Sequence, residues 1–248
     1  MYNPFALKDK TILITGASSG IGAEAAIQCS KMGGKLIITG RDKERLEKTF
    51  SQLEGQGHEQ HIADLTREDE INNLVDTIPV LDGIVLNAGI GLTKIIKFLK
   101  KDDIDTIFMT NFKSPVLISQ KLLASKKVNK GSSFVFISSI APRVISPGNS
   151  MYAATKGAMN AFAKTLAKEV APQKIRVNCI QPGTIKTLLL ASKANSDDQW
   201  AVDEKKYLIG RFGVPEDIAY LIIYLLSDAS QWMTGTGIII DGGHSLYK

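Results

Sequence analysis

Residues 11–22 of this 248-residue chain read TILITGASSGIG, an apolar run that passes directly into a glycine-rich turn. The run is typical of a buried strand, and residues 23–32 that follow it are typical of a helix. Such a turn lets the backbone approach a pyrophosphate closely, while the helix N-terminus offers free N–H donors. Its G-x3-G-x-G spacing differs from the common G-x-G-x-x-G dinucleotide fingerprint. The stretch predicts a phosphate-binding loop in an α/β fold.

The same turn allows a second interpretation. Gly16 to Gly20 also match the G-x-S-x-G turn of serine hydrolases, and His244 lies late enough in the chain to complete a triad. Such an enzyme needs earlier strands for its oxyanion hole, whereas only ten residues precede this strand. We therefore favour phosphate binding.

Further apolar runs have the length and composition of strands, and segments typical of helices separate them. The expected strands cover residues 35–39, 58–62, 83–86, 133–138, 175–180 and 237–240, with helices at 43–53, 68–76, 102–125, 152–170 and 215–226. Strands that alternate with helices form a parallel sheet covered on both faces. We predict one α/β domain over residues 1–248, a Rossmann fold with a doubly wound, seven-stranded parallel sheet. Residues 186–213, with Leu188–Leu190 and Trp200, are predicted as an irregular loop on the substrate side.

Three residues form a candidate proton-transfer site. Tyr152 and Lys156 lie one helical turn apart on one helix face, and Ser139 follows a predicted strand. A phenol loses its proton near pH ~10, and a neighbouring ammonium favours the phenolate, so we expect Lys156 to lower the pKa of Tyr152. The Ser139 hydroxyl can bind a carbonyl or alcohol oxygen. The trio predicts proton transfer during the interconversion of a carbonyl group and an alcohol. The common alternative for a Tyr and a Lys at this spacing is a Tyr ring packed in the core beside a Lys amine in solvent.

The end of the second strand bears on the choice of dinucleotide. An Arg there can hold a ribose 2′-phosphate, and a carboxylate can hold a 2′-hydroxyl. Arg41 directly follows Gly40 at the strand tip and favours NADP(H). Asp42 keeps NAD(H) open, because it can either cap the next helix or reach a ribose.

Composition excludes several classes of protein. The net charge of +5 is spread out, and the lysine clusters at 97–101 and 121–130 lack interleaved aromatic residues, so we expect no nucleic-acid partner. No apolar run is long enough to cross a membrane, and the N-terminus does not resemble a signal peptide. We therefore expect a cytoplasmic protein. Cys29 and Cys179 are expected to be buried free thiols, and no metal-ligand spacing is present.

Together these motifs resemble those of the short-chain dehydrogenase/reductases. The resemblance covers nearly the whole chain and rests on Thr15-Gly16-x3-Gly20-Ile21-Gly22, Asn87-Ala88-Gly89, Asn111, Ser139, Tyr152-x3-Lys156 and Pro182-Gly183. The Arg41 strand end and the tail Asp241-Gly242-Gly243 look closest to the 3-oxoacyl-[acyl-carrier-protein] reductase branch. Leu86 departs from the asparagine that is usual at its position.

The resemblance implies an NADP(H)-dependent oxidoreductase that transfers hydride between nicotinamide and a carbonyl or secondary alcohol. It implies Tyr152 as general acid/base, Lys156 as the group that lowers its pKa and holds the nicotinamide ribose, and Ser139 as the group that orients the carbonyl. Asn111, placed mid-helix by the sequence, would anchor a water in a proton relay. The other residues implied to bind the cofactor are Gly16, Ser18, Ser19, Gly20 and Ile21 at the pyrophosphate, Arg41, Asp64 and Leu65 around the adenosine, Asn87, Ala88 and Gly89 beside it, and Pro182, Gly183, Ile185 and Thr187 near the carboxamide.

The sequence leaves several substrates and oligomeric states open. An acyl-carrier-protein thioester is one candidate, and the lysines that could dock an acidic carrier are Lys126, Lys127, Lys130 and Lys174. Gln173, however, stands where the branch usually has an arginine. The alternatives are an NAD(H)-dependent alcohol, sugar or steroid-type dehydrogenase and a non-catalytic dinucleotide sensor. The family suggests a homotetramer or dimer, and small residues on the Tyr152 helix would permit close packing, namely Ala153, Ala154, Gly157, Ala158 and Ala161.

Overall fold

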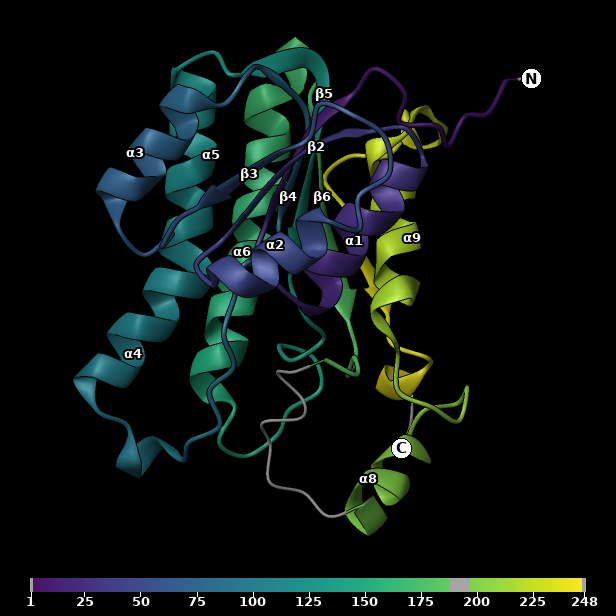
Figure 1. Cartoon of the computed structure of the whole chain (residues 1–248). Helices are drawn as coiled ribbons and strands as arrows, with labels where there is room; N and C mark the ends of the chain where they lie inside the picture. Colours follow the sequence, from purple (N-terminus) through teal and green to yellow (C-terminus); the bar gives the residue numbers. More distant parts are fainter. Residues whose placement is uncertain (1, 188–196, 247–248) are drawn as a thin grey trace.

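A parallel sheet of seven strands forms the centre of the molecule (Figure 1). The structure is a computed structural model and describes residues 2–187 and 197–246. The strands are β1 (Thr11–Thr15), β2 (Lys35–Gly40), β3 (Glu59–Ile62), β4 (Leu81–Leu86), β5 (Val128–Ile137), β6 (Arg176–Pro182) and β7 (Gly237–Ile240). Their order is β3-β2-β1-β4-β5-β6-β7, and every neighbouring pair is parallel. The predicted Rossmann-type sheet is confirmed.

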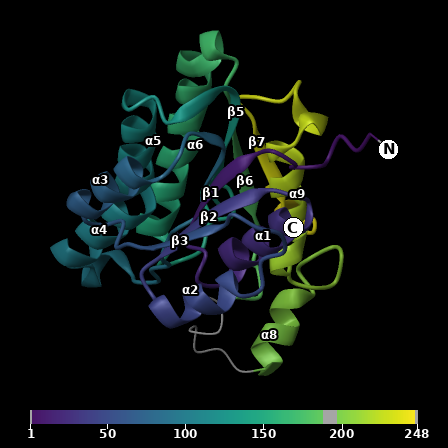
Figure 2. The same ribbon diagram turned by 45° about the horizontal axis from the view of Figure 1, so that its top comes forward.

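Helices cover both faces of this sheet (Figures 1 and 2). They are α1 (Gly20–Lys31), α2 (Lys43–Phe50), α3 (Glu68–Thr77), α4 (Lys101–Phe108), α5 (Ser114–Ala124), α6 (Ser150–Val170), α8 (Asp197–Glu204) and α9 (Pro215–Leu226). Successive strand residues point to opposite faces, so Ile12 packs with α1 and α9 whereas Leu13 packs with α3, α5 and α6. The two hydrophobic cores therefore lie on either side of the sheet.

The strand order reverses beside β1, because β2 lies on one side of it and β4 on the other. Ligands of doubly wound sheets bind in the crevice that such a reversal leaves beyond the carboxyl ends of the strands. The glycine-rich turn after β1 and the loop after β4 meet at this place. The fold thus positions the predicted site before any side chain is considered.

The helix predicted over residues 102–125 is wrong as a continuous α-helix. A π-helical turn, Met109–Lys113, separates α4 from α5. Asn111 lies in this turn and is buried, and its side chain bonds to the backbone of Ile90. π-Turns insert one residue into the helical repeat and occur frequently at functional sites. The insertion aims Asn111 toward the loop after β4 rather than at solvent.

The segment predicted as an irregular loop over residues 186–213 is partly helical, since it contains α8. Trp200 packs edge-on against Phe212, with ring centroids 5.8 Å apart. This ring contact shows that Trp200 anchors its helix. Leu188–Leu190 lie outside the described residues.

The expectation that the two cysteines are buried free thiols is confirmed. Cys29 and Cys179 are free and buried. No helix within the described ranges is long and apolar enough to span a membrane. Residues 2–187 and 197–246 also contain no group of His, Cys, Asp or Glu that could hold a metal ion.

Candidate active site

The turn between β1 and α1 needs glycine at two points for different reasons. Gly16 has φ +66°, and a Cβ on it would lie 2.8 Å from the Cα of Ala88. Gly22 has an ordinary helical backbone, but a Cβ there would lie only 2.3 Å from the carbonyl oxygen of Gly16. No side chain fits at either point. The turn therefore packs directly against the end of β4 and presents its backbone to the crevice.

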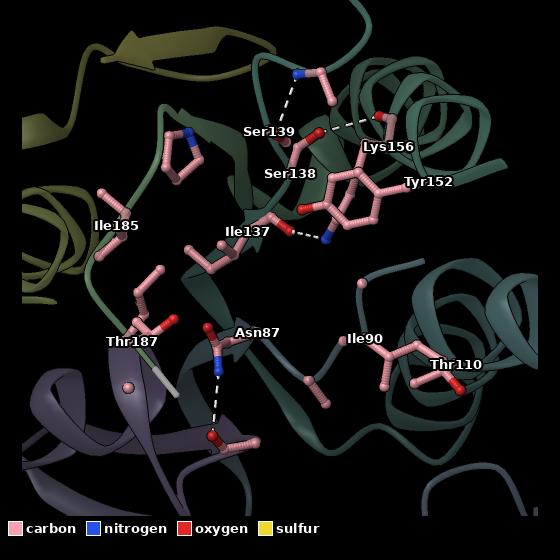
Figure 3. A pocket seen from close by; sticks show the side chains of 18 of the residues that line it. Asn87, Ile90, Thr110, Ile137, Ser138, Ser139, Tyr152, Lys156, Ile185 and Thr187 are labelled. Atoms are coloured by element: carbon pink, nitrogen blue, oxygen red, sulfur yellow. Dashed lines mark hydrogen bonds between the residues drawn. The ribbon is translucent and has the colours of Figure 1, made fainter. Parts of the chain in front are cut away.

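Thr15 and Asn87 fasten this turn to β4. The Thr15 hydroxyl accepts hydrogen bonds from the backbone N–H groups of Asn87 at 3.0 Å and Ala88 at 3.1 Å. The Asn87 side chain in turn donates to the carbonyl oxygens of Thr15 at 3.0 Å and Gly16 at 3.3 Å. Figure 3 labels Asn87 and draws one of its hydrogen bonds. These bonds fix the two strand ends that flank the reversal of strand order. Asn87 thus shapes the crevice through the backbone of the neighbouring strand.

The end of β2 presents an exposed arginine, Arg41, followed by a carboxylate that caps the next helix. Asp42 caps α2 by accepting from the backbone N–H of Arg45 at 3.1 Å, and its carboxylate also pairs with the Arg45 guanidinium at 3.2 Å. Arg41 is exposed and has no ion-pair partner among the described residues. Of the two roles considered for Asp42, capping the next helix or reaching a ribose, this geometry matches the helix cap.

Asp64, after β3, is held as a carboxylate. It accepts hydrogen bonds from the backbone N–H of Thr66 at 3.0 Å and from the Thr66 hydroxyl at 2.7 Å. These bonds, together with the more distant charge of Arg41, lower the pKa of Asp64 below its ordinary value. A fixed anion therefore lies at this end of the crevice.

The catalytic candidates come from β5 and α6. The Lys156 ammonium donates to the carbonyl oxygen of Ile137 at 2.8 Å and lies 5.6 Å from the centre of the Tyr152 ring (Figure 3). The Ser138 hydroxyl donates to the carbonyl oxygen of Lys156 at 3.0 Å, which ties α6 to the end of β5. Ser139 accepts from the backbone N–H of Ala141 at 3.1 Å. Three consecutive residues at the end of β5 thus position the two side chains of α6 and the facing hydroxyl.

Burial controls the ionisation of this trio. Burial raises the pKa of Tyr152, and the Ser139 hydroxyl opposes the rise only in part. Burial also lowers the pKa of Lys156 to about 8. The expected lowering of the Tyr152 pKa by Lys156 is therefore not seen in the protein without ligand. Desolvation disfavours the charged form of both groups.

Asn111 stands behind the trio. Its side-chain oxygen accepts from the backbone N–H of Ile90 at 2.8 Å, and its amide donates to the Ile90 carbonyl at 2.9 Å. The amide also approaches the Thr155 hydroxyl at 3.4 Å. These bonds occupy the side chain and hold the loop after β4. The water-anchoring role implied for Asn111 stays a prediction.

A cleft at the carboxyl edge of the sheet brings the predicted site residues together. Except for Asn111, every residue predicted to be catalytic or to bind the cofactor lines it: Gly16, Ser18, Ser19, Gly20, Ile21, Arg41, Asp64, Leu65, Asn87, Ala88, Gly89, Ser139, Tyr152, Lys156, Pro182, Gly183, Ile185 and Thr187. They come from the carboxyl ends of β1 to β6 with the loops that follow, and from helices α1 and α6, which are far apart in sequence. The hydrolase alternative gains nothing here, because no hydrogen bond joins Ser18 to His244 within the described part of the chain.

Sequence reasoning missed one wall of the cleft, formed by Tyr207 and His244, which we call the tail wall. The two rings stack with centroids 4.5 Å apart and an angle of 12° between their planes. The Tyr207 hydroxyl accepts from the backbone N–H of Thr184 at 3.1 Å. Tyr207 lies beside no strand end in sequence, and His244, which follows the end of β7 at Ile240, was considered only as a hydrolase residue. Their packing reveals them as one wall of the cleft.

Known proteins are similar in sequence to this protein over most of its length. A family model described as enoyl-(acyl-carrier-protein) reductase matches residues 16–245. The 3-oxoacyl-[acyl-carrier-protein] reductase of Rickettsia bellii is 34% identical over 237 residues, which are 96% of this chain and 97% of that protein. The corresponding reductase of Thermotoga maritima is 32% identical over 243 residues, covering 96% and 98% of the two chains.

Solved structures of short-chain dehydrogenase/reductases also match nearly the whole chain. A short-chain dehydrogenase/reductase from Mycobacterium marinum matches with a TM-score of 0.89 and 31% identity over 97% of both chains. A double mutant of a short-chain dehydrogenase/reductase from Serratia marcescens matches with a TM-score of 0.89 and 29% identity, covering 98% of this chain and all of that one. This chain therefore belongs to the short-chain dehydrogenase/reductase family and is an oxidoreductase.

Proposed function

We propose that this protein uses NADP(H) to reduce a carbonyl compound to a secondary alcohol, with a 3-oxoacyl thioester as its substrate. The observation that carries the proposal is that Tyr152, Ser139 and the glycine-rich turn line one cleft. A proton donor and a carbonyl-binding hydroxyl thus share a cavity with a phosphate-binding turn. The name of the Rickettsia bellii and Thermotoga maritima relatives supports the choice of substrate.

The turn after β1 fits a dinucleotide pyrophosphate. A Cβ on Gly20 would lie 3.0 Å from the Cγ2 of Thr187, so the bare backbone leaves room between α1 and the loop after β6. The N-terminus of α1 would place its free N–H groups toward the phosphates. Arg41 would bind the 2′-phosphate of NADP(H), because its guanidinium is exposed and the neighbouring carboxylate already caps a helix. When bound, the reduced nicotinamide supplies the hydride.

The residues of the chain supply the proton. Ser139 holds the carbonyl oxygen, and the Tyr152 phenol donates its proton to that oxygen. A raised pKa keeps this phenol protonated at neutral pH, which suits a proton donor. The Lys156 ammonium beside the ring stabilises the phenolate that the transfer leaves. Lys156 thus acts on the product of proton transfer more than on the resting phenol.

Three of the four lysines considered for carrier docking lie far from the cleft of their own chain. Lys126, Lys127 and Lys130 lie at the amino end of β5, whereas the cleft lies at the carboxyl ends of the strands. Ten residues of β5 span about 30 Å. Lys127 is also engaged, because its ammonium donates to the carbonyl oxygens of Asp76 at 3.2 Å and Ile78 at 2.6 Å. The thioester proposal therefore includes no docking role for these residues within one chain.

A substrate panel tests the proposal. Purified protein is incubated with NADPH or NADH and with 3-oxoacyl thioesters, small ketones, a steroid ketone and a keto sugar, while absorbance of the reduced nicotinamide is recorded. We expect the fastest consumption with NADPH and a 3-oxoacyl thioester. Binding of NADPH without turnover of any carbonyl compound would indicate the sensor alternative. Faster turnover of another carbonyl class or of NADH would overturn the corresponding half of the proposal.

A further inference from the structure

The tail wall carries a polar atom that the proposed chemistry leaves unused. His244 is half-buried and lines the same cleft as Ser139 and Tyr152. Its Nδ1 lies 3.3 Å from the carbonyl oxygen of Lys206. A carbonyl oxygen can only accept, so Nδ1 carries the proton in this contact and Nε2 of the neutral ring has a free lone pair. Nε2 has no hydrogen-bond partner among residues 2–187 and 197–246.

His244 is also held firmly in place. Both carboxylate oxygens of Asp241 are engaged, one by the backbone N–H of Gly243 at 3.0 Å and the other by that of Ser245 at 2.7 Å. The backbone N–H of His244 donates to the Asp241 carbonyl at 3.0 Å. The ring itself lies flat on Tyr207, whose hydroxyl is fixed by Thr184. An ordered imidazole with one unpaired acceptor can recognise a hydrogen-bond donor of a ligand, because the His244 side chain loses little rotational entropy when the ligand binds.

We propose that His244 determines substrate specificity by accepting, at Nε2, a hydrogen bond from an N–H or O–H group of the substrate that is remote from the reacting carbonyl. This inference rests on the proposed carbonyl reduction and narrows its substrate class. Apolar residues, including Leu92, Ala141 and Val144, line other parts of the cleft. The favoured substrate therefore combines an apolar body with a hydrogen-bond donor.

The test compares two 3-oxoacyl thioesters that differ in this donor. The N-acetylcysteamine thioester carries an amide N–H, whereas the thioester with an N-methylated amide has the same carbonyl group and lacks the donor. The ratio of their kcat/KM values is measured for the wild type, His244→Phe and His244→Gln. Phe keeps the stacking on Tyr207 and removes the acceptor, and Gln keeps an acceptor.

For one hydrogen bond we expect a wild-type ratio of roughly five in favour of the N–H thioester. His244→Phe should bring the ratio near one by raising KM for the N–H thioester, with kcat little changed, and His244→Gln should restore much of the preference. A wild-type ratio near one, or a ratio in His244→Phe equal to that of the wild type, would overturn the inference. If His244→Phe does not fold, His244→Met gives the same comparison. Failure of the wild type to reduce either thioester would instead contradict the proposed function.

Discussion

At the scale of single residues, Arg41 should set the preference for NADP(H). Its guanidinium is unpaired among the described residues, so a 2′-phosphate would gain a charge-assisted bond without displacing an existing partner. Arg41→Ala should raise KM for NADPH roughly tenfold and leave KM for NADH nearly unchanged. Lys48→Ala removes the same charge from the exposed part of α2 and serves as the control. Equal changes in both KM values would contradict the assignment of the 2′-phosphate to Arg41.

Lys156 should give the protein without ligand an unusual stability profile. Burial lowers its pKa from the ordinary 10.5 to about 8. Between these two pH values the unfolded chain holds the proton and the folded chain does not, so this group makes the free energy of unfolding rise with pH. Below pH 8 both states are protonated and the contribution is constant.

The measurement is urea unfolding of the wild type and Lys156→Met at several pH values. Other titrating groups are shared, so their effects cancel in the difference between the two proteins. The wild type should gain stability relative to Lys156→Met by up to about 3 kcal/mol as the pH rises through this window. Parallel curves for the two proteins would show that Lys156 is not desolvated as the structure indicates.

At the scale of elements, the close contact between the glycine turn and α1 should be indispensable for binding. A Cβ at position 22 would overlap the Gly16 carbonyl, so Gly22→Ala should displace the turn, cost about 1–3 kcal/mol of stability and weaken NADPH binding at least tenfold. Fluorescence titration with NADPH measures the binding.

Gly131→Ala is a matched control for this change. Gly131 has φ +83°, so alanine is strained there, but no atom lies within 4 Å of the added Cβ and the site is at the far end of β5. It should lose about 1–2 kcal/mol of stability and keep its affinity for NADPH. Comparable loss of affinity in both variants would mean that lower stability, rather than the shape of the turn, weakens binding.

The elements differ in how far the sequence could reveal them. Apolar runs and glycine spacing predicted the sheet and the turn after β1, because both depend on local pattern. The π-turn at Asn111 was not predictable, since one inserted residue leaves helix propensity unchanged and depends on a bond to Ile90. The stacking of His244 on Tyr207 and its contact with Lys206 join residues far apart in the chain, which sequence pattern does not show. The pKa of Tyr152 likewise depends on burial, which spacing alone cannot give.

At the scale of the whole molecule, we expect a homotetramer in which α6 packs against another subunit. Ala154 and Ala161 are exposed in the single chain, and Ala153, Gly157 and Ala158 are half-buried, so a smooth helix face is available. Light scattering should give four times the chain mass of 27.0 kDa. Ala161→Arg should reduce this mass, whereas Ala201→Arg, on the exposed part of α8, should not. A wild-type monomer would exclude this assembly.

The most direct test of the account is the comparison of Tyr152→Phe with the wild type. NADPH affinity and the rate of NADPH consumption with a 3-oxoacyl thioester are measured on the same preparations. Phe keeps the ring and removes the proton donor, so we predict an affinity within about threefold of the wild type and a kcat lower by about 10²–10⁴-fold. A Tyr152→Phe protein that turns over at the wild-type rate would contradict the assignment of proton transfer to this phenol.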